Sequence, residues 1–340
     1  MPAMSLWIIL LETAIHTPSP HNVQPWRLRV KNELEADLLI DTARALPKED
    51  PTGSFIILTM GMFIEALSVM AANHRHQLDY ELVHPPDWYA RAILDARTQE
   101  FLPFAGLRLR ADDTIENNHY DRSLFKKRRT SRLALLPNPV PAETTAALRA
   151  LAAASDQRYE EITDATLIER ILDQNTRALF HDLNAPDYHD EITSWFRFTD
   201  RASLRHRDGL DYRCMNTSRP TYWMTARFPK LLQLPLARSL MARKYRQQLG
   251  PVPTMGMLAG DFWAPAQAFA TGRFFMRFWL ELASRDLYIH PFGNLVTNQK
   301  AAQWMLEETK VPDIWLVFKI GYSNEPPKSH RRSVEEILID

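Results

Sequence analysis

Three segments of this sequence combine residue types that could bind an anion or a planar heterocycle. The first, residues 18–26 (PSPHNVQPW), presents a hydroxyl, an imidazole and two side-chain amides in a loop stiffened by prolines. Each amide offers a paired donor and acceptor, which suits the edge of a heterocycle that alternates donors and acceptors. A capping turn without a ligand is the simpler interpretation of the same residues.

The other two segments are cationic. Residues 126–132 (KKRRTSR) carry five cations and two hydroxyls within seven residues, and Arg331-Arg332 lies near the C-terminus. Arginine binds phosphate oxygens through two parallel charge-assisted hydrogen bonds, so either segment could hold a phosphate group. A solvated charge run and an ordinary surface pair are the alternatives.

The composition limits the function classes. Lys and Arg number 41, as do Asp and Glu, so no bulk attraction to nucleic acid or to an anionic membrane is expected, and any anion site must be local. The single cysteine, Cys214, can form neither an internal disulfide nor a Cys-type zinc site, and no metal site is expected. It favours a reducing, cytoplasmic location, as does the early apolar run, which no basic residue precedes and which Glu12 interrupts.

Two nucleotide-binding folds lose their main support, because neither GxGxxG nor GxxxxGK[ST] occurs. Apolar and polar periodicity instead predicts a mixture of helices and strands. The apolar stretch 55–72 carries Glu65 and is predicted to be a buried helix and not a membrane span. Helices are expected to dominate from about residue 164 to 310. The predicted strands are residues 26–30, 36–40, 78–83, 104–110, 159–163 and 314–322.

The polar stretch 112–127 is the best candidate for a linker between two halves, residues 1–115 and 116–340. Beyond it, Pro141 and Glu143 are typical of a helix start. The first half carries PSPHNVQPW and the second carries RRTSR. No fixed-period repeat is visible.

Together the motifs resemble the FMN-dependent nitroreductase superfamily. The matching stretches are PSPHNVQPW, RRTSR followed by PNPVPAE, and the closing RRSVEEIL. Their order, with PSPHNVQPW first, is similar to the tandem, twin-domain or Acg-like branch. That resemblance implies an α+β nitroreductase-like fold with mixed or antiparallel sheets flanked by helices. Its two fused halves form an intramolecular pseudo-dimer, which is either monomeric or dimerises further.

The resemblance also implies one FMN site per chain and assigns roles to residues. Arg128, Thr130 and Arg132 would contact the phosphate, with Arg331 as a further cation. Gln24 and Trp26 would brace the loop. The expected flavin contacts from the loop and from residues 289–293 are Pro18, Ser19, His21, Asn22, Pro291 and Gly293.

The implied activity is NADH- or NADPH-dependent reduction of a nitroaromatic, a quinone or a similar small electrophile by a ping-pong cycle through flavin N5. His21 is a conceivable proton donor, because histidine titrates near neutrality. Two other hypotheses stay open. One is a protein that binds or sequesters FMN with little turnover, and the other is a helical globular protein without flavin.

We expect the exchange of Arg128 or Arg132 for alanine to weaken FMN binding about ten- to hundredfold, because each charged hydrogen bond to phosphate contributes roughly 1.5–3 kcal/mol. Titration of the purified protein with FMN, followed by flavin fluorescence, measures the change. Unchanged affinity in either variant shows that the phosphate does not contact that arginine.

Overall fold

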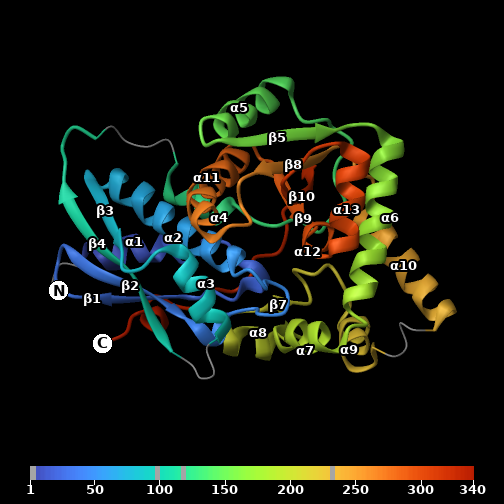
Figure 1. The fold of residues 1–340 in the computed structure, drawn as a ribbon, viewed down its shortest axis with the longest axis horizontal. Helices are drawn as coiled ribbons and strands as arrows, with labels where there is room; N and C mark the ends of the chain where they lie inside the picture. The colour runs from blue at the N-terminus through green and yellow to red at the C-terminus, as the bar shows by residue number, and fades with distance from the viewer. Residues whose placement is uncertain (1–4, 96–99, 116–119, 230–233) are drawn as a thin grey trace. The chain divides into compact units, whose positions relative to one another are not determined.

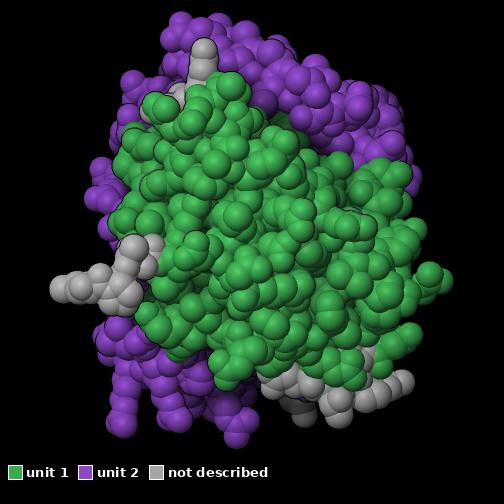
Figure 2. Space-filling model, turned by 90° about the vertical axis from the view of Figure 1, so that its left-hand side faces the viewer, with its two compact units in different colours: residues 1–128, 262–284, 330–340 green, residues 129–261, 285–329 purple. Residues whose placement is uncertain are grey.

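The computed structural model describes residues 5–95, 100–115, 120–229 and 234–340. Their contacts divide the chain into two compact units (Figure 2). Unit 1 comprises residues 1–128, 262–284 and 330–340, and unit 2 comprises residues 129–261 and 285–329. Each unit therefore joins segments that are far apart in the sequence.

Unit 1 contains a four-stranded antiparallel sheet in the order β1-β2-β4-β3 (Figure 1). The predicted hairpin is confirmed, with Trp26 opposite Ile40, and the two later predicted strands are also present. The strands are β1 (Trp26–Val30), β2 (Glu35–Asp41), β3 (His76–Leu82) and β4 (Phe101–Ala111). The helical elements are α1 (Leu6–Ala14), η1 (Pro20–Asn22), η2 (Thr42–Arg44), α2 (Ser54–Asn73), α3 (Pro86–Asp95), α4 (Arg122–Lys127), α11 (Pro265–Ser284) and α14 (Val334–Ile337).

Helix α2 is the predicted buried helix. Gly53 precedes it with φ +69°, a conformation that glycine adopts easily, and Asp50 accepts a hydrogen bond from the Ile56 N–H at 3.0 Å. Burial raises the pKa of Asp50 to about 6. By length and composition α2 could cross a membrane, but 83% of its most apolar window is buried inside the protein. The prediction of a buried helix over this stretch is confirmed.

Two glycines let α2 and α11 approach each other closely. A Cβ atom at Gly61 would lie 2.2 Å from the carbonyl oxygen of Phe269, and one at Gly272 would lie 2.1 Å from that of Leu58. Each glycine is the eighth residue of a 20-residue helix. At the crossing, the eighth residue of each helix therefore contacts the backbone of the other helix.

A buried carboxylate fixes the same helix pair. Glu65 of α2 is 1% exposed and forms ion pairs with Arg273 and Arg277 of α11, the former at 2.8 Å. Arg273 also donates to the Tyr80 hydroxyl at 3.1 Å. A buried charge needs such partners, because desolvating it alone costs several kcal/mol.

Unit 2 contains a second four-stranded antiparallel sheet, in the order β5-β8-β10-β9. The predicted strands at 159–163 and 314–322 are confirmed as β5 (Gln157–Ile162) and β10 (Ile314–Gly321). Helices dominate this region as expected, and strands β8 (Met255–Gly260) and β9 (Tyr288–Pro291), which were not predicted, interrupt them. The sequence of β8, MGMLAG, has no β-branched or aromatic residue, and β9 is short and ends in proline, so neither has a strong strand signal.

A long, mostly helical segment joins β5 to β8, which are neighbouring strands of the sheet. Two short strands, β6 (Phe196–Arg197) and β7 (Leu210–Asp211), pair in parallel within it. The helices of unit 2 are α5 (Ala142–Ala153), α6 (Ala165–Asp182), α7 (Pro186–Ser194), α8 (Asp200–His206), α9 (Arg219–Arg227), α10 (Pro235–Leu249), α12 (Asn294–Thr297) and α13 (Gln299–Thr309). The helix predicted to begin near Pro141 is confirmed as α5.

The two sheets have the same strand order. Counted along the chain within each sheet, the strands lie first, second, fourth, third in both units. A 20-residue helix separates the second and third strands each time, α2 in one case and α11 in the other. The α+β class with antiparallel sheets flanked by helices is confirmed.

The predicted linker region is partly regular. Strand β4 ends at Ala111, and residues 122–127 form the short helix α4, capped by the Asp121 carboxylate. Residues 116–119 of the predicted linker lie outside the described residues. The predicted boundary between residues 115 and 116 stays a prediction.

The helix crossing gives a stability test. Gly61→Ala and Gly272→Ala should each lower the free energy of unfolding by about 1–3 kcal/mol, because the new methyl overlaps a backbone carbonyl that cannot rotate away. Chemical denaturation measures the loss. Gly106→Ala is the control, because a Cβ atom there meets nothing within 4 Å. Unchanged or increased stability in both helix variants contradicts the close crossing.

Candidate functional site

The PSPHNVQPW loop has an unusual backbone. His21, Asn22 and Gln24 have φ values of +46°, +57° and +53°, which non-glycine residues adopt rarely and at an energetic cost. The Ser19 hydroxyl accepts a hydrogen bond from the Gln24 N–H at 3.0 Å and helps to hold this shape. Trp26 anchors the end of the loop by stacking on Phe63, with ring centroids 4.7 Å apart. The loop is therefore held in one strained conformation.

The C-terminal segment is bound to this loop. The Arg332 N–H donates to the Gln24 side-chain carbonyl at 2.9 Å, and the buried Arg332 guanidinium donates to the main-chain carbonyls of Gln24 and Trp26 at 3.0 Å. Further along, the Ile339 N–H donates to the carbonyl of Leu28. The expected bracing role of Gln24 and Trp26 is thus found, with Arg332 as the partner.

The same contact brings the predicted tail cation to the loop. Arg331 donates from Nη1 to the side-chain oxygen of Asn22 at 2.6 Å. The Asn22 amide nitrogen in turn donates to the carbonyl of His330 at 3.0 Å. Asn22 therefore forms hydrogen bonds with the side chain of Arg331 and with the main chain of His330.

Arg128, from the predicted basic segment, lies in the same unit. Its Nη2 donates to the carbonyl of His16 at 3.0 Å, and its guanidinium stands over the Trp279 ring at 4.5 Å from the centroid. Arg128 is only 5% exposed. A guanidinium retains its charge when buried, so it brings a full positive charge into the interior.

The partly buried imidazole of His16 responds to the charges of this region. Burial lowers the pKa of His16 to about 3, and the cations Arg331 and Arg128 contribute more to this lowering than Lys126 and Arg122 do. His16 is therefore neutral at physiological pH. Both predicted phosphate-binding arginines of unit 1 act on this one point, where the local potential is positive.

His21 forms an ion pair with Glu49 through its Nε2 atom. Both side chains are partly buried, and His21 sits in the strained part of the loop. The contact with Glu49 fixes the orientation of the imidazole ring.

The other predicted residues belong to unit 2. Thr130 forms a parallel bridge with Ile289, just before Pro291 in β9, and Gly293 precedes α12. Arg132 donates from Nη1 to the carbonyl of Cys214 at 3.1 Å. Residues of the RRTSR segment and of the segment 289–293 are thus neighbours.

A second neutral histidine lies beside these residues. Burial holds the pKa of His290 well below its usual range, and the charges of Arg132 and Lys319 lower it further. Lys319 is fully buried and donates to the carbonyls of Leu133 and Leu249 at 2.6 and 3.2 Å. Its own pKa is lowered to about 8 by burial and by Arg132. Unit 2 therefore also has a positive interior.

The predicted site residues fall into two groups. Unit 1 brings together the loop, Arg128 and Arg331, whereas Thr130, Arg132, Pro291 and Gly293 lie in unit 2. Sequence reasoning missed His16, Glu49, Trp279 and Lys319. Only His16 had a usable signal, because it immediately precedes the proline-rich loop.

Of three comparisons with known proteins, only the comparison with solved structures gives matches. No family model matches this sequence, and no curated protein matches it. Among solved structures, the chain is similar to the FMN-dependent nitroreductase NfnB from Mycobacterium smegmatis in complex with NADPH, at 19% identity over 64% of this chain and 91% of that one, with a TM-score of 0.36.

Two further structures are similar at the same level. A nitroreductase with bound FMN from Bacteroides fragilis is 14% identical over 63% of this chain and 94% of its own, with a TM-score of 0.33. A nitroreductase-like family protein from Bacillus cereus is 12% identical over 64% and 94%, with a TM-score of 0.36. All three carry the nitroreductase name. A likeness this loose says nothing about function, which has to be inferred from the chain's own residues.

The pKa of His16 can be measured and tests this account of its surroundings. Because its folded pKa, about 3, lies below the ordinary value of 6.5, only the unfolded state is protonated between these values. His16 therefore lowers stability progressively as pH falls from 6.5 toward 3, by up to about 1.4 kcal/mol per pH unit. Histidine-labelled NMR should show no titration of His16 between pH 5 and 8.

In the same experiment Arg331→Gln should raise the pKa of His16, since Arg331 is the cation that lowers it most. Arg129→Gln is the control, because that side chain pairs with Glu325 and is not among the groups that shift His16. A His16 resonance that titrates near 6.5 in the unaltered protein contradicts the buried, positive environment.

Proposed function

We propose that this chain binds FMN and works as an NAD(P)H-dependent oxidoreductase on a small electrophile such as a nitroaromatic or a quinone. The observation that carries the proposal is that Arg331 donates a hydrogen bond to Asn22, Arg128 donates one to the His16 carbonyl, and both arginines lower the pKa of His16. Three motifs that resemble those of FMN-dependent nitroreductases each contribute to that one region. The substrate class comes from the resemblance alone.

The donor set fits a phosphate group. Arg128 and Arg331 are guanidinium groups, whose planar donors match phosphate oxygens, and the local field disfavours even a protonated histidine. A dianion would be attracted by the same field. The residues that would hold the phosphate are therefore Arg128 and Arg331.

Asn22 acts in this arrangement as a positioning residue. Its direct hydrogen bond with Arg331 makes the loop a neighbour of the tail cation, and in this proposal both serve the phosphate end of the ligand. The side-chain oxygen of Asn22 orients the guanidinium, while Arg332 holds the tail in place. Substitutions at Asn22 should therefore act on phosphate binding.

Bound FMN supplies a carrier for hydride between the nicotinamide donor and the electrophile. The chain's own contribution is to bind, to orient and to move protons. His21, fixed by Glu49, is placed to hold a proton for the acceptor. The predicted flavin contacts of Pro18, Ser19, Pro291 and Gly293 stay predictions, as do the predicted phosphate contacts of Thr130 and Arg132.

We also propose that the chain is a fused pair of nitroreductase-like halves. Two features support this: the shared strand order, and the glycine at the same position of the long helix in each half. Only one half has the PSPHNVQPW loop and only the other has RRTSR, which favours a single FMN site per chain.

Anaerobic reduction tests the proposal. The purified protein with FMN should lose its yellow absorbance on addition of NADH or NADPH and regain it on addition of a quinone or nitroaromatic. Arg331→Ala should weaken FMN binding about ten- to hundredfold, and Arg129→Ala, whose side chain pairs with Glu325, should leave it unchanged.

The outcomes separate the competing functions. FMN that binds tightly but is not bleached by either nicotinamide contradicts the oxidoreductase and supports a flavin-binding protein without turnover. A protein that ignores FMN contradicts both.

A further inference from the structure

Helices α9 and α10 of unit 2 form a cationic region in a chain with no net charge. From residue 219 to residue 249 the sequence has no Asp or Glu. The cations in this stretch that lie within the described residues are Arg219, Arg227, Arg238, Arg243, Lys244 and Arg246.

Large apolar side chains are exposed on the same helices. On α9, Trp223 is 49% exposed, and it meets the exposed Phe228 edge-on with ring centroids 5.6 Å apart. On α10, Leu236 and Leu240 are 74% and 60% exposed and lie one helical turn apart. The described chain exposes no other large apolar side chain as much as Leu236.

The opposite sides of these helices are occupied by packing. Met241 of α10 packs against Phe180 and Leu183, and Tyr222 of α9 stacks on Phe196 at 4.2 Å. A hydrogen bond from Lys244 to the Thr221 hydroxyl, 2.9 Å long, joins the two helices. The exposed apolar residues are thus not needed for the packing of unit 2.

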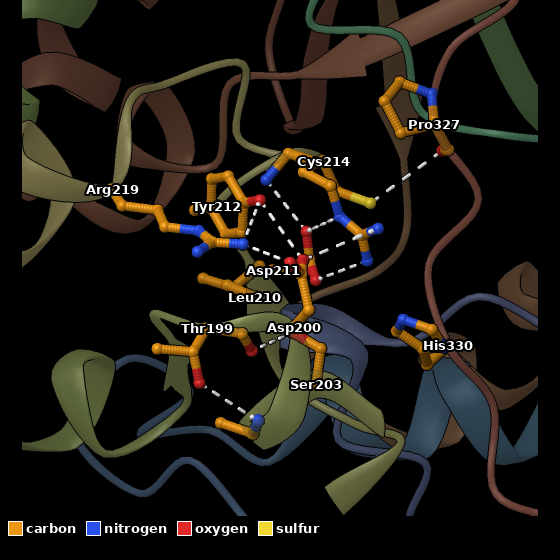
Figure 3. A network of polar contacts seen from close by, with 12 residues as sticks. Thr199, Asp200, Ser203, Leu210, Asp211, Tyr212, Cys214, Arg219, Pro327 and His330 are labelled. Atoms are coloured by element: carbon orange, nitrogen blue, oxygen red, sulfur yellow. Dashed lines mark hydrogen bonds and ion pairs between the residues drawn. The ribbon is translucent and has the colours of Figure 1, made fainter. Parts of the chain in front are cut away.

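Ion pairs neutralise only the edges of the region. Arg219 pairs with Asp200 (Figure 3). Arg213, just before α9, pairs with Asp211 at 3.0 Å. Arg246 pairs with Glu169. For Arg227, Arg238 and Arg243 there is no ion pair within the described residues.

We propose that this outer face of α9 and α10 docks on an anionic lipid surface. Interfacial helices combine exposed Trp, Phe and Leu with Lys and Arg, because the apolar groups enter the acyl boundary while the cations meet the headgroups. Pairing with a second copy of the chain would place like charges opposite each other. Nucleic acid offers the charges but no counterpart for protruding leucines.

This partner differs from what the balanced composition predicts. The net charge gives no bulk attraction to membranes, but residues 219–249 concentrate cations in a stretch that contains no Asp or Glu. The docking face is independent of the FMN proposal, since none of its residues belongs to that site.

Vesicle flotation with the full chain tests the docking. Binding is expected to phosphatidylcholine vesicles that contain phosphatidylglycerol, with loss at high salt, and not to pure phosphatidylcholine. Arg243→Gln should weaken binding about fivefold, and the triple exchange of Arg227, Arg238 and Arg243 for glutamine on the order of a hundredfold. Arg91→Gln, at an exposed position of α3, is the control and should change nothing.

The apolar part needs its own pair of variants. Leu236→Gln should reduce vesicle binding, whereas Val83→Gln, at an apolar position of unit 1 that is 51% exposed, should not. Thermal unfolding confirms that all variants fold. Equal binding to both vesicle types, no binding, or no effect of the α10 variants overturns the proposal. So does a dimer in sedimentation velocity that Leu236→Gln dissociates while vesicle binding is absent.

Discussion

Buried guanidinium groups hold the loop of unit 1 and its surroundings in place. Arg128 and Arg332 are almost fully enclosed, and a buried charge is tolerated only when hydrogen bonds replace its water. Main-chain carbonyls of His16, Gln24 and Trp26 supply those bonds. Because these carbonyls belong to the first loop and its flanks, satisfying the charges fixes the C-terminal segment on the loop and carries Arg331 to Asn22.

These arginines make the surroundings of His16 positive, and the lowered pKa of His16 is the evidence for this. Its imidazole stays neutral because burial and neighbouring arginines both oppose protonation. In unit 2, His290 is kept neutral in the same way by burial, Arg132 and Lys319. Although the charges of the whole chain balance, cations are therefore concentrated around His16 and around His290. A positive field of this kind attracts anions.

Local features of this protein could be predicted from the sequence, and long-range ones could not. Alternating residues indicated the hairpin of β1 and β2, and the apolar run indicated α2, because these signals are contained within one element. The strand β8 was missed because its residues have low β-propensity. The contact between Asn22 and Arg331 joins residues 309 positions apart, and no local pattern encodes that pairing. The motifs indicated which residues could form a site, and the resemblance, not their spacing, suggested that they meet.

The central claim is that Arg331 and Arg128 bind a phosphate group, and comparison of two flavins tests it most directly. FMN and riboflavin differ only in that phosphate. Fluorescence titration of the full chain with each should show FMN binding at least about a hundredfold more tightly, since two charged contacts are at stake. Equal affinities for FMN and riboflavin would contradict the account.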